Sequence, residues 1–184
     1  MHPGINGPKL KDKPAIIMAG SGEILTHQEV NELSNQIAHL FRSLGLNAGD
    51  SMAFMMENHK YFLPIAAAAY RSGLIYTAIS WRLQPEEVEY IVKDCEAKLF
   101  ITSKSQLAVA EPLIGKLSDE LSCYMLDGVA PGFESWEDAL ASRPTSLIDD
   151  PSFGGPMLYS SGTTGYPKGV KRPLSEETYE DKEE

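Results

Sequence analysis

The stretch Ser51-Met-Ala-Phe-Met-Met56 is a run of strand length in which every residue after the serine is apolar. A strand with one face in water alternates apolar and polar side chains, whereas a strand covered on both faces is apolar throughout. Strands covered on both faces occur mainly in parallel sheets, because helices pack on either side of such sheets. The run therefore predicts an interior strand of an α/β protein.

Short apolar runs and helical patterns alternate on both sides of this strand. Before it, the runs 15–18 and 23–25 flank a glycine-rich turn and predict a hairpin, and Thr26 with Glu29 forms a capping box that opens an amphipathic helix ending near Gly45. After it we expect helix 60–71, strand 74–79, helix 85–94, strand 98–102, helix 106–117, strand 123–126 and helix 136–141. This alternation is typical of βαβ units, so we predict an α/β fold with a mainly parallel sheet.

The charge and hydropathy of the 184 residues exclude several classes of partner. The formal net charge is −10, and nucleic-acid binding requires a basic stripe that displaces counterions, so we expect no nucleic-acid partner. The longest apolar run, 61–70, is too short to cross a bilayer, which predicts no transmembrane segment. No secretory signal is visible before Pro14, so we expect a cytoplasmic location.

The cysteines and histidines show no spacing typical of a metal site. Cys95 and Cys123 are too far apart for a C-x-x-C pair, and the four histidines form no cluster. We therefore expect two buried, reduced thiols and assign no metal ligand.

A second distinctive stretch, Tyr159-Ser-Ser-Gly-Thr-Thr-Gly-Tyr-Pro-Lys-Gly-Val170, follows a segment, 142–156, with loop composition and a short expected strand, 157–159. Its glycines let an anion approach the backbone, its hydroxyls and amides are donors, and Lys168 adds positive charge. The stretch suits a polyphosphate, but its composition also suits a solvated loop without a ligand. It is not the common G-x-x-x-x-G-K-[ST] loop, because Gly169 follows the lysine.

These twelve residues resemble the phosphate-binding signature of the adenylate-forming superfamily, which includes acyl-CoA synthetases, luciferases and peptide-synthetase adenylation domains. The segment 51–94, with Asn58 after its strand, is similar to an early segment of the same family. Ala78 and Ser80 depart from the proline and asparagine that the family often has there. The resemblance implies the N-terminal portion of a large adenylate-forming-enzyme domain, with strands and helices alternating around a mainly parallel sheet.

The resemblance also implies an AMP-forming acid-thiol ligase of the acyl-CoA synthetase type, which joins a carboxylic acid to ATP as an acyl adenylate and then to coenzyme A as a thioester. It implies ATP and Mg²⁺, with coenzyme A as co-substrate. The phosphate-binding residues it implies are Ser160, Ser161, Gly162, Thr163, Thr164, Gly165 and Lys168. The two serines could instead cap the backbone, and the lysine could be merely solvated. The family's main catalytic residues lie beyond the loop, so none is assigned.

The same resemblance implies a partial AMP-binding (adenylation) domain, 1–173, followed by an acidic tail, 174–184, that we expect to be disordered. Because such a chain looks truncated, we expect it to be inactive alone. We also expect it to self-associate, since a piece of a larger sheet exposes strand edges and apolar faces. The alternative is a non-catalytic remnant that binds nucleotide phosphates or a partner.

Overall fold

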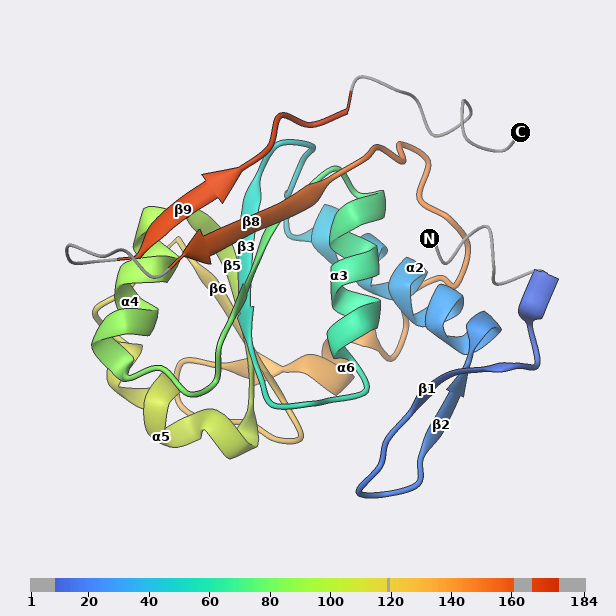
Figure 1. Ribbon diagram of the computed structural model, residues 1–184, viewed down its shortest axis with the longest axis horizontal. Coiled ribbons are helices and arrows are strands. Elements are labelled where there is room, and N and C mark those ends of the chain that lie inside the picture. Colours follow the sequence, from blue (N-terminus) through green and yellow to red (C-terminus); the bar gives the residue numbers. More distant parts are fainter. Residues whose placement is uncertain (1–8, 119, 161–166, 176–184) are drawn as a thin grey trace.

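Strand β3 (Ser51–Met55) lies in the middle of a seven-stranded sheet in the computed structural model, which describes residues 9–118, 120–160 and 167–175 (Figure 1). On one side of β3 follow β5 (Ala97–Ser103), β6 (Ser122–Leu126) and β7 (Glu134–Ser135), and on the other β4 (Ile75–Ile79), β8 (Gly155–Ser160) and β9 (Lys168–Lys171). Neighbouring strands are parallel except β8 and β9, which are antiparallel. The predicted α/β fold with a mainly parallel sheet is confirmed.

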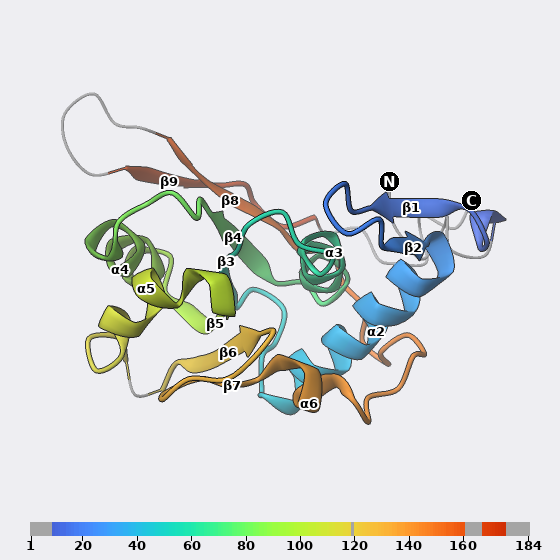
Figure 2. The same ribbon diagram turned by 90° about the horizontal axis from the view of Figure 1, so that it is seen from below.

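Helices cover both faces of the sheet, so that the fold has three layers (Figure 2). Side chains of α2, α3 and α6 join one apolar core, and side chains of α4, α5 and η2 join the other. The bounds of the helices are α2 His27–Ser43, α3 Phe62–Arg71, α4 Pro85–Asp94, α5 Leu107–Ala110 and α6 Trp136–Leu140, with short 3₁₀ turns η1 Lys104–Gln106 and η2 Glu111–Leu113.

The side chains of β3 alternate between the two cores. Met52 and Phe54 belong to the core under α2, α3 and α6, whereas Ala53 and Met55 belong to the core under α4 and α5. All four side chains are fully buried. The uninterrupted apolar run is explained by this position, because neither face of the strand meets water.

Helix α2 begins at the predicted capping box, after the antiparallel hairpin of β1 (Pro14–Ile17) and β2 (Ile24–Thr26). The Glu29 amide donates to Thr26 Oγ1 over 3.2 Å, and the Thr26 amide donates to the Glu29 carboxylate over 2.7 Å. Thr26 Oγ1 also donates to the Glu29 carboxylate over 2.8 Å, and the Thr26 amide, followed by this hydroxyl, lowers the pKa of Glu29. Gly45 follows the helix with a φ of 78°, the left-handed conformation in which a glycine commonly terminates a helix.

The predicted single helix over 106–117 is wrong. The segment instead forms η1, the four-residue helix α5 and η2 in succession. Pro112 supplies the physical reason, since it has no amide donor and its ring would collide with the carbonyl of Ala108 in a continuous helix. The predictions for helices 85–94 and 136–141 agree with α4 and α6 to within one residue.

The loop predicted over 142–156 is two residues shorter in the structure, because β8 already begins at Gly155, and the loop runs along α2. Asn35 Nδ2 donates to the Thr145 carbonyl over 2.6 Å, and Arg42 Nε donates to both carboxylate oxygens of Asp150 over 3.0 and 2.9 Å. The loop is therefore fixed to the helix before it enters β8.

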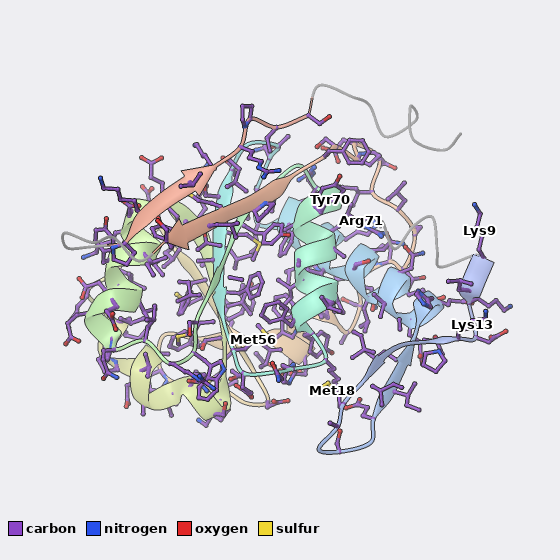
Figure 3. The ribbon with its side chains drawn as sticks, in the orientation of Figure 1. Lys9, Lys13, Met18, Met56, Tyr70 and Arg71 are labelled. Atoms are coloured by element: carbon purple, nitrogen blue, oxygen red, sulfur yellow. The ribbon has the colours of Figure 1, made fainter. Side chains whose placement is uncertain are left out.

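The end of α3 carries a buried arginine that joins it to α2. The side chain of Arg71 is fully buried, and its Nη2 donates to Asn31 Oδ1 over 2.9 Å. Figure 3 shows Arg71 beside Tyr70 at this end of the helix. Because a buried guanidinium must be hydrogen-bonded, this contact fixes the end of α3 from which the chain turns into β4.

Both cysteines are free, as expected, but they are buried to different extents. Cys95 is buried, whereas Cys123 is only half-buried, so the prediction of two buried thiols is wrong for Cys123. Burial raises the pKa of both thiols, that of Cys123 to about 11.

Candidate phosphate-binding hairpin

The two ends of the predicted phosphate-binding segment face each other across an antiparallel hairpin. Ser160 closes β8 and Lys168 opens β9, and the two residues are register partners. Both side chains are exposed. The structure therefore brings together the first and last of the seven predicted residues, while the other five, 161–165, lie outside the described residues.

Strand β8 is aligned by backbone contacts with the end of α3 and the start of β4. The Gly154 amide donates to the Tyr70 carbonyl over 2.7 Å, and the Gly155 amide donates to the Leu74 carbonyl over 3.0 Å. A Cβ on Gly154 would collide with the carbonyl oxygens of Leu74 and Ala69. Only glycine permits this close approach, which fixes the position of the start of β8 against the end of α3.

Most of the hairpin lies beyond the parallel sheet. Strand β8 pairs with β4 only at Ile75 with Gly155 and Tyr76 with Pro156. From Met157 onward its register partners are on β9, and both views show the hairpin passing over α4 (Figures 1 and 2). The position of its outer end therefore depends on contacts with α4.

Two tyrosine hydroxyls connect this outer part to α4. Tyr159 Oη donates to Asp94 Oδ2 over 2.6 Å, and Tyr90 Oη donates to the Pro167 carbonyl over 3.1 Å. Burial, followed by the contact with Asp94, raises the pKa of the Tyr159 hydroxyl strongly. The hydroxyl thus stays protonated at neutral pH and remains a donor.

The opposite face of the hairpin is exposed and apolar. Leu158 and Val170 are register partners, and 63% and 59% of their surfaces are accessible. Met157 and Tyr159, which alternate with Leu158, instead pack against the core under α4. The hairpin therefore has one face on the protein and one free face, among the residues that the structure describes.

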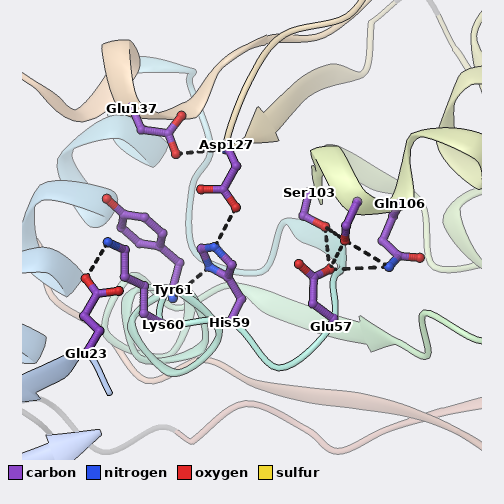
Figure 4. Close-up of polar contacts among 10 residues, drawn as sticks. Glu23, Glu57, His59, Lys60, Tyr61, Ser103, Gln106, Asp127 and Glu137 are labelled. Carbon is purple, nitrogen blue, oxygen red and sulfur yellow. Dashed lines mark hydrogen bonds and ion pairs between the residues drawn. The ribbon is translucent and has the colours of Figure 1, made fainter. Parts of the chain in front are cut away.

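Sequence reasoning did not identify a second polar group, at the carboxyl ends of β3, β5 and β6 (Figure 4). Glu57 accepts hydrogen bonds from Ser103, Ser105 and Gln106, and His59 Nε2 lies 3.0 Å from Asp127. Partial burial would raise the pKa of Glu57, but the hydroxyl donors outweigh it and lower that pKa. The available signal was the polar residues that directly follow each apolar strand, where ligands of open parallel sheets bind.

Within residues 9–118, 120–160 and 167–175, no group of three His, Cys, Asp or Glu side chains is placed to hold a metal ion. Within the same ranges, every helix is too short or too polar to cross a lipid bilayer.

Comparison with known proteins places this fold and hairpin in one family. The family described as "AMP-binding enzyme" matches residues 6–174. Similar proteins include the fatty acid–acyl-carrier-protein ligase ScoC of Streptomyces coeruleorubidus, with 28% identity over 85% of this chain and 29% of the relative. The long-chain-fatty-acid–CoA ligase of Thermus thermophilus is 29% identical over 86% of this chain and 30% of the relative.

A solved structure agrees with these sequence matches. The anthranilate CoA ligase AuaEII, crystallised with anthranoyl-AMP, superposes with a TM-score of 0.80 and 27% identity. The superposition covers 90% of this chain and 32% of AuaEII. The chain thus spans about a third of the length of the relatives it matches, and it corresponds to their N-terminal portion, as predicted. The chain belongs to the AMP-binding enzyme family.

Proposed function

We propose that this chain is part of an AMP-forming acid-thiol ligase of the acyl-CoA synthetase type. The observation that carries the proposal is the pairing of Ser160 with Lys168, which brings both ends of a segment rich in donors to one place. The CoA ligases among the relatives support the reaction class. The substrates would be a carboxylic acid, ATP and coenzyme A.

The reaction explains why such a segment is useful. A carboxylate oxygen attacks the α-phosphorus of ATP, the bond from that phosphorus to its bridging oxygen breaks, and pyrophosphate leaves. The thiol sulfur of coenzyme A then attacks the acyl carbon, and AMP leaves. Negative charge therefore builds on the departing pyrophosphate, and fixed donors stabilise such charge in the transition state.

The residues we assign to this task hold the β- and γ-phosphates. Ser160 would donate its hydroxyl, and Lys168 would bring a positive charge to the same phosphates from the facing strand. Glycines between them would leave room for phosphate oxygens close to the backbone. The assigned residues are Ser160, Ser161, Gly162, Thr163, Thr164, Gly165 and Lys168.

Magnesium accompanies ATP in this chemistry, and it prefers carboxylate and other oxygen ligands. Among the described residues, no group of three His, Cys, Asp or Glu side chains is placed to hold a metal ion, so we assign no residue to Mg²⁺.

The chain would comprise a partial adenylation domain, 1–173, followed by an acidic tail, 174–184, most of which lies outside the described residues. Alone, it would bind ATP without turnover. It would also self-associate through the edge strand β9 and the exposed pair Leu158 and Val170.

A chimera tests the function of the hairpin. Residues 155–171 would replace the equivalent segment of the Thermus thermophilus long-chain-fatty-acid–CoA ligase, and pyrophosphate release would be measured with a panel of fatty acids. We expect the chimera to retain turnover. We expect the rate of pyrophosphate release to be about a hundredfold lower in the same chimera carrying Lys168→Ala. A folded chimera with no turnover, or one insensitive to Lys168→Ala, would refute the assignment.

A further inference from the structure

We propose that Tyr90 and Asp94 of α4 are positioning residues that hold the outer end of the β8–β9 hairpin in place for phosphate binding. The inference rests on the proposed function of this hairpin. It adds two residues that lie outside the phosphate-binding segment and 66 or more positions before it in the sequence.

The two contacts hold both strands next to the ends of that segment. Tyr159, which donates to Asp94, directly precedes Ser160. Pro167, whose carbonyl accepts from Tyr90, directly precedes Lys168. A single helix therefore fixes both points at which the chain enters and leaves the segment.

Tyr90 and Asp94 act as one unit because they lie one turn apart on α4. Tyr90 Oη lies 3.4 Å from Asp94 Oδ1, while Tyr159 Oη lies 2.6 Å from Asp94 Oδ2. Because a tyrosine hydroxyl has a single hydrogen, Tyr90 donates it to the nearer Pro167 carbonyl, and the Asp94 carboxylate accepts mainly from Tyr159. A hydrogen bond to a charged acceptor is stronger and more directional than one between neutral groups, which suits a positioning contact.

Gly169 is the third component of this arrangement. It is the register partner of Tyr159, and a Cβ on Gly169 would collide with the Met157 methyl group and lie 2.9 Å from Tyr159 Cζ and 3.0 Å from Tyr159 Oη. The missing side chain therefore leaves the space that the ends of the Met157 and Tyr159 side chains occupy beside β9. This gives the glycine after Lys168 a role that phosphate binding alone does not explain.

The hairpin needs such support because little else holds its outer part. It shares two register positions with β4, and a two-stranded hairpin by itself is marginally stable in water. Without the contacts to α4, Ser160 and Lys168 would still pair with each other but would move relative to the rest of the protein.

Amide hydrogen exchange of the 184-residue chain tests the contact itself. The variants are Tyr159→Phe, Asp94→Asn and Gly169→Ala, and the matched control is Tyr76→Phe, whose hydroxyl has no hydrogen-bond partner among the described residues. We expect exchange at 157–160 and 168–171 to become about fivefold faster in the three variants and to stay unchanged in the control. Unchanged exchange at Met52–Met55 shows that the variants fold. The double variant Tyr159→Phe with Asp94→Asn should exceed Tyr159→Phe by little, because Tyr159→Phe already removes the bond that Asp94→Asn weakens by taking away the charge of the acceptor.

Calorimetric titration of the same proteins with ATP and Mg²⁺ tests the positioning role. We expect the Kd to rise about fivefold in the three variants and not in Tyr76→Phe. Faster exchange with an unchanged Kd, or unchanged exchange in all variants, would overturn the inference. Failure of the unaltered chain to bind ATP would instead remove the proposed function and the positioning role together, leaving faster exchange as a purely structural effect.

Discussion

Ser160 and Lys168 face each other at the outer end of the β8–β9 hairpin, where a small hydroxyl and a primary amine project from adjacent exposed positions. The pairing follows from the register of β8 and β9. Contacts with the end of α3, with β4 and with α4 hold this hairpin in place. Each of these supports can be altered separately by substitution, so effects on the stability of the fold can be distinguished from effects on the function of the hairpin.

The close approach of β8 to α3 predicts unequal effects at two adjacent glycines. Gly154→Ala would press a methyl group against the Leu74 and Ala69 carbonyl oxygens and should lower the free energy of unfolding by about 2 kcal/mol. Gly155→Ala is the matched control, because a Cβ there has no described atom within 4 Å. Urea unfolding of both variants measures the difference. Equal losses would show that the close contact does not determine the placement of β8.

The capping box of α2 predicts a loss of stability without a change in the hairpin. Thr26→Ala removes the hydroxyl that accepts from the Glu29 amide and should cost about 1 kcal/mol of unfolding free energy. Glu32→Ala, at a half-buried position of the same helix, removes a contact with Gln28 and should cost a few tenths of a kcal/mol. Denaturant titration followed by circular dichroism compares the two variants. A larger loss in Glu32→Ala would contradict the cap.

The raised pKa of Cys123 predicts a slow thiol and an alkaline loss of stability. A pKa of about 11 instead of 9.0 leaves about a hundredfold less thiolate at pH 8, so a disulfide reagent should label the native protein far more slowly than the unfolded chain. A raised folded-state pKa contributes stability below pH 9.0 that is lost as the pH rises through 11.

Cys123→Ser provides the control for this prediction. Its unfolding free energy should fall less steeply between pH 9 and 11 than that of the unaltered chain, with Tyr159, whose pKa is also raised, accounting for part of the remaining slope. Rapid labelling of native Cys123 at pH 8 would argue against its burial.

Parts of the fold with a strong local signal were predictable from the sequence. The apolar run of β3, the capping box of Thr26 and the Pro85 start of α4 each have one physical reading, and the structure agrees. The prediction of one helix over 106–117 was wrong. Its apolar residues recur with a helical period, but Pro112 interrupts the backbone hydrogen bonds that a continuous helix needs.

The supports of the candidate site were not predictable, because they join residues distant in sequence. The spacing of Tyr90 and Asp94 indicates only a helix face, and their contacts with Pro167 and Tyr159 depend on where β8 leaves the sheet. Glu57 meets Ser103 and Ser105 for the same reason, since parallel strands bring their carboxyl ends together only after the sheet forms. The motif itself was recognisable because its residues are contiguous.

The most direct test of the central claim is calorimetric titration of the 184-residue chain with ATP at physiological ionic strength, comparing Lys168→Ala with Lys171→Ala. Both lysines are exposed on β9 and both variants remove one positive charge, but Lys168 pairs with Ser160 whereas Lys171 pairs with Met157 at the inner end of the hairpin. We predict that the unaltered chain binds ATP, that Lys168→Ala weakens binding at least about tenfold, and that Lys171→Ala changes it less than about twofold. Equal weakening by the two variants, or no binding by the unaltered chain, would contradict the account.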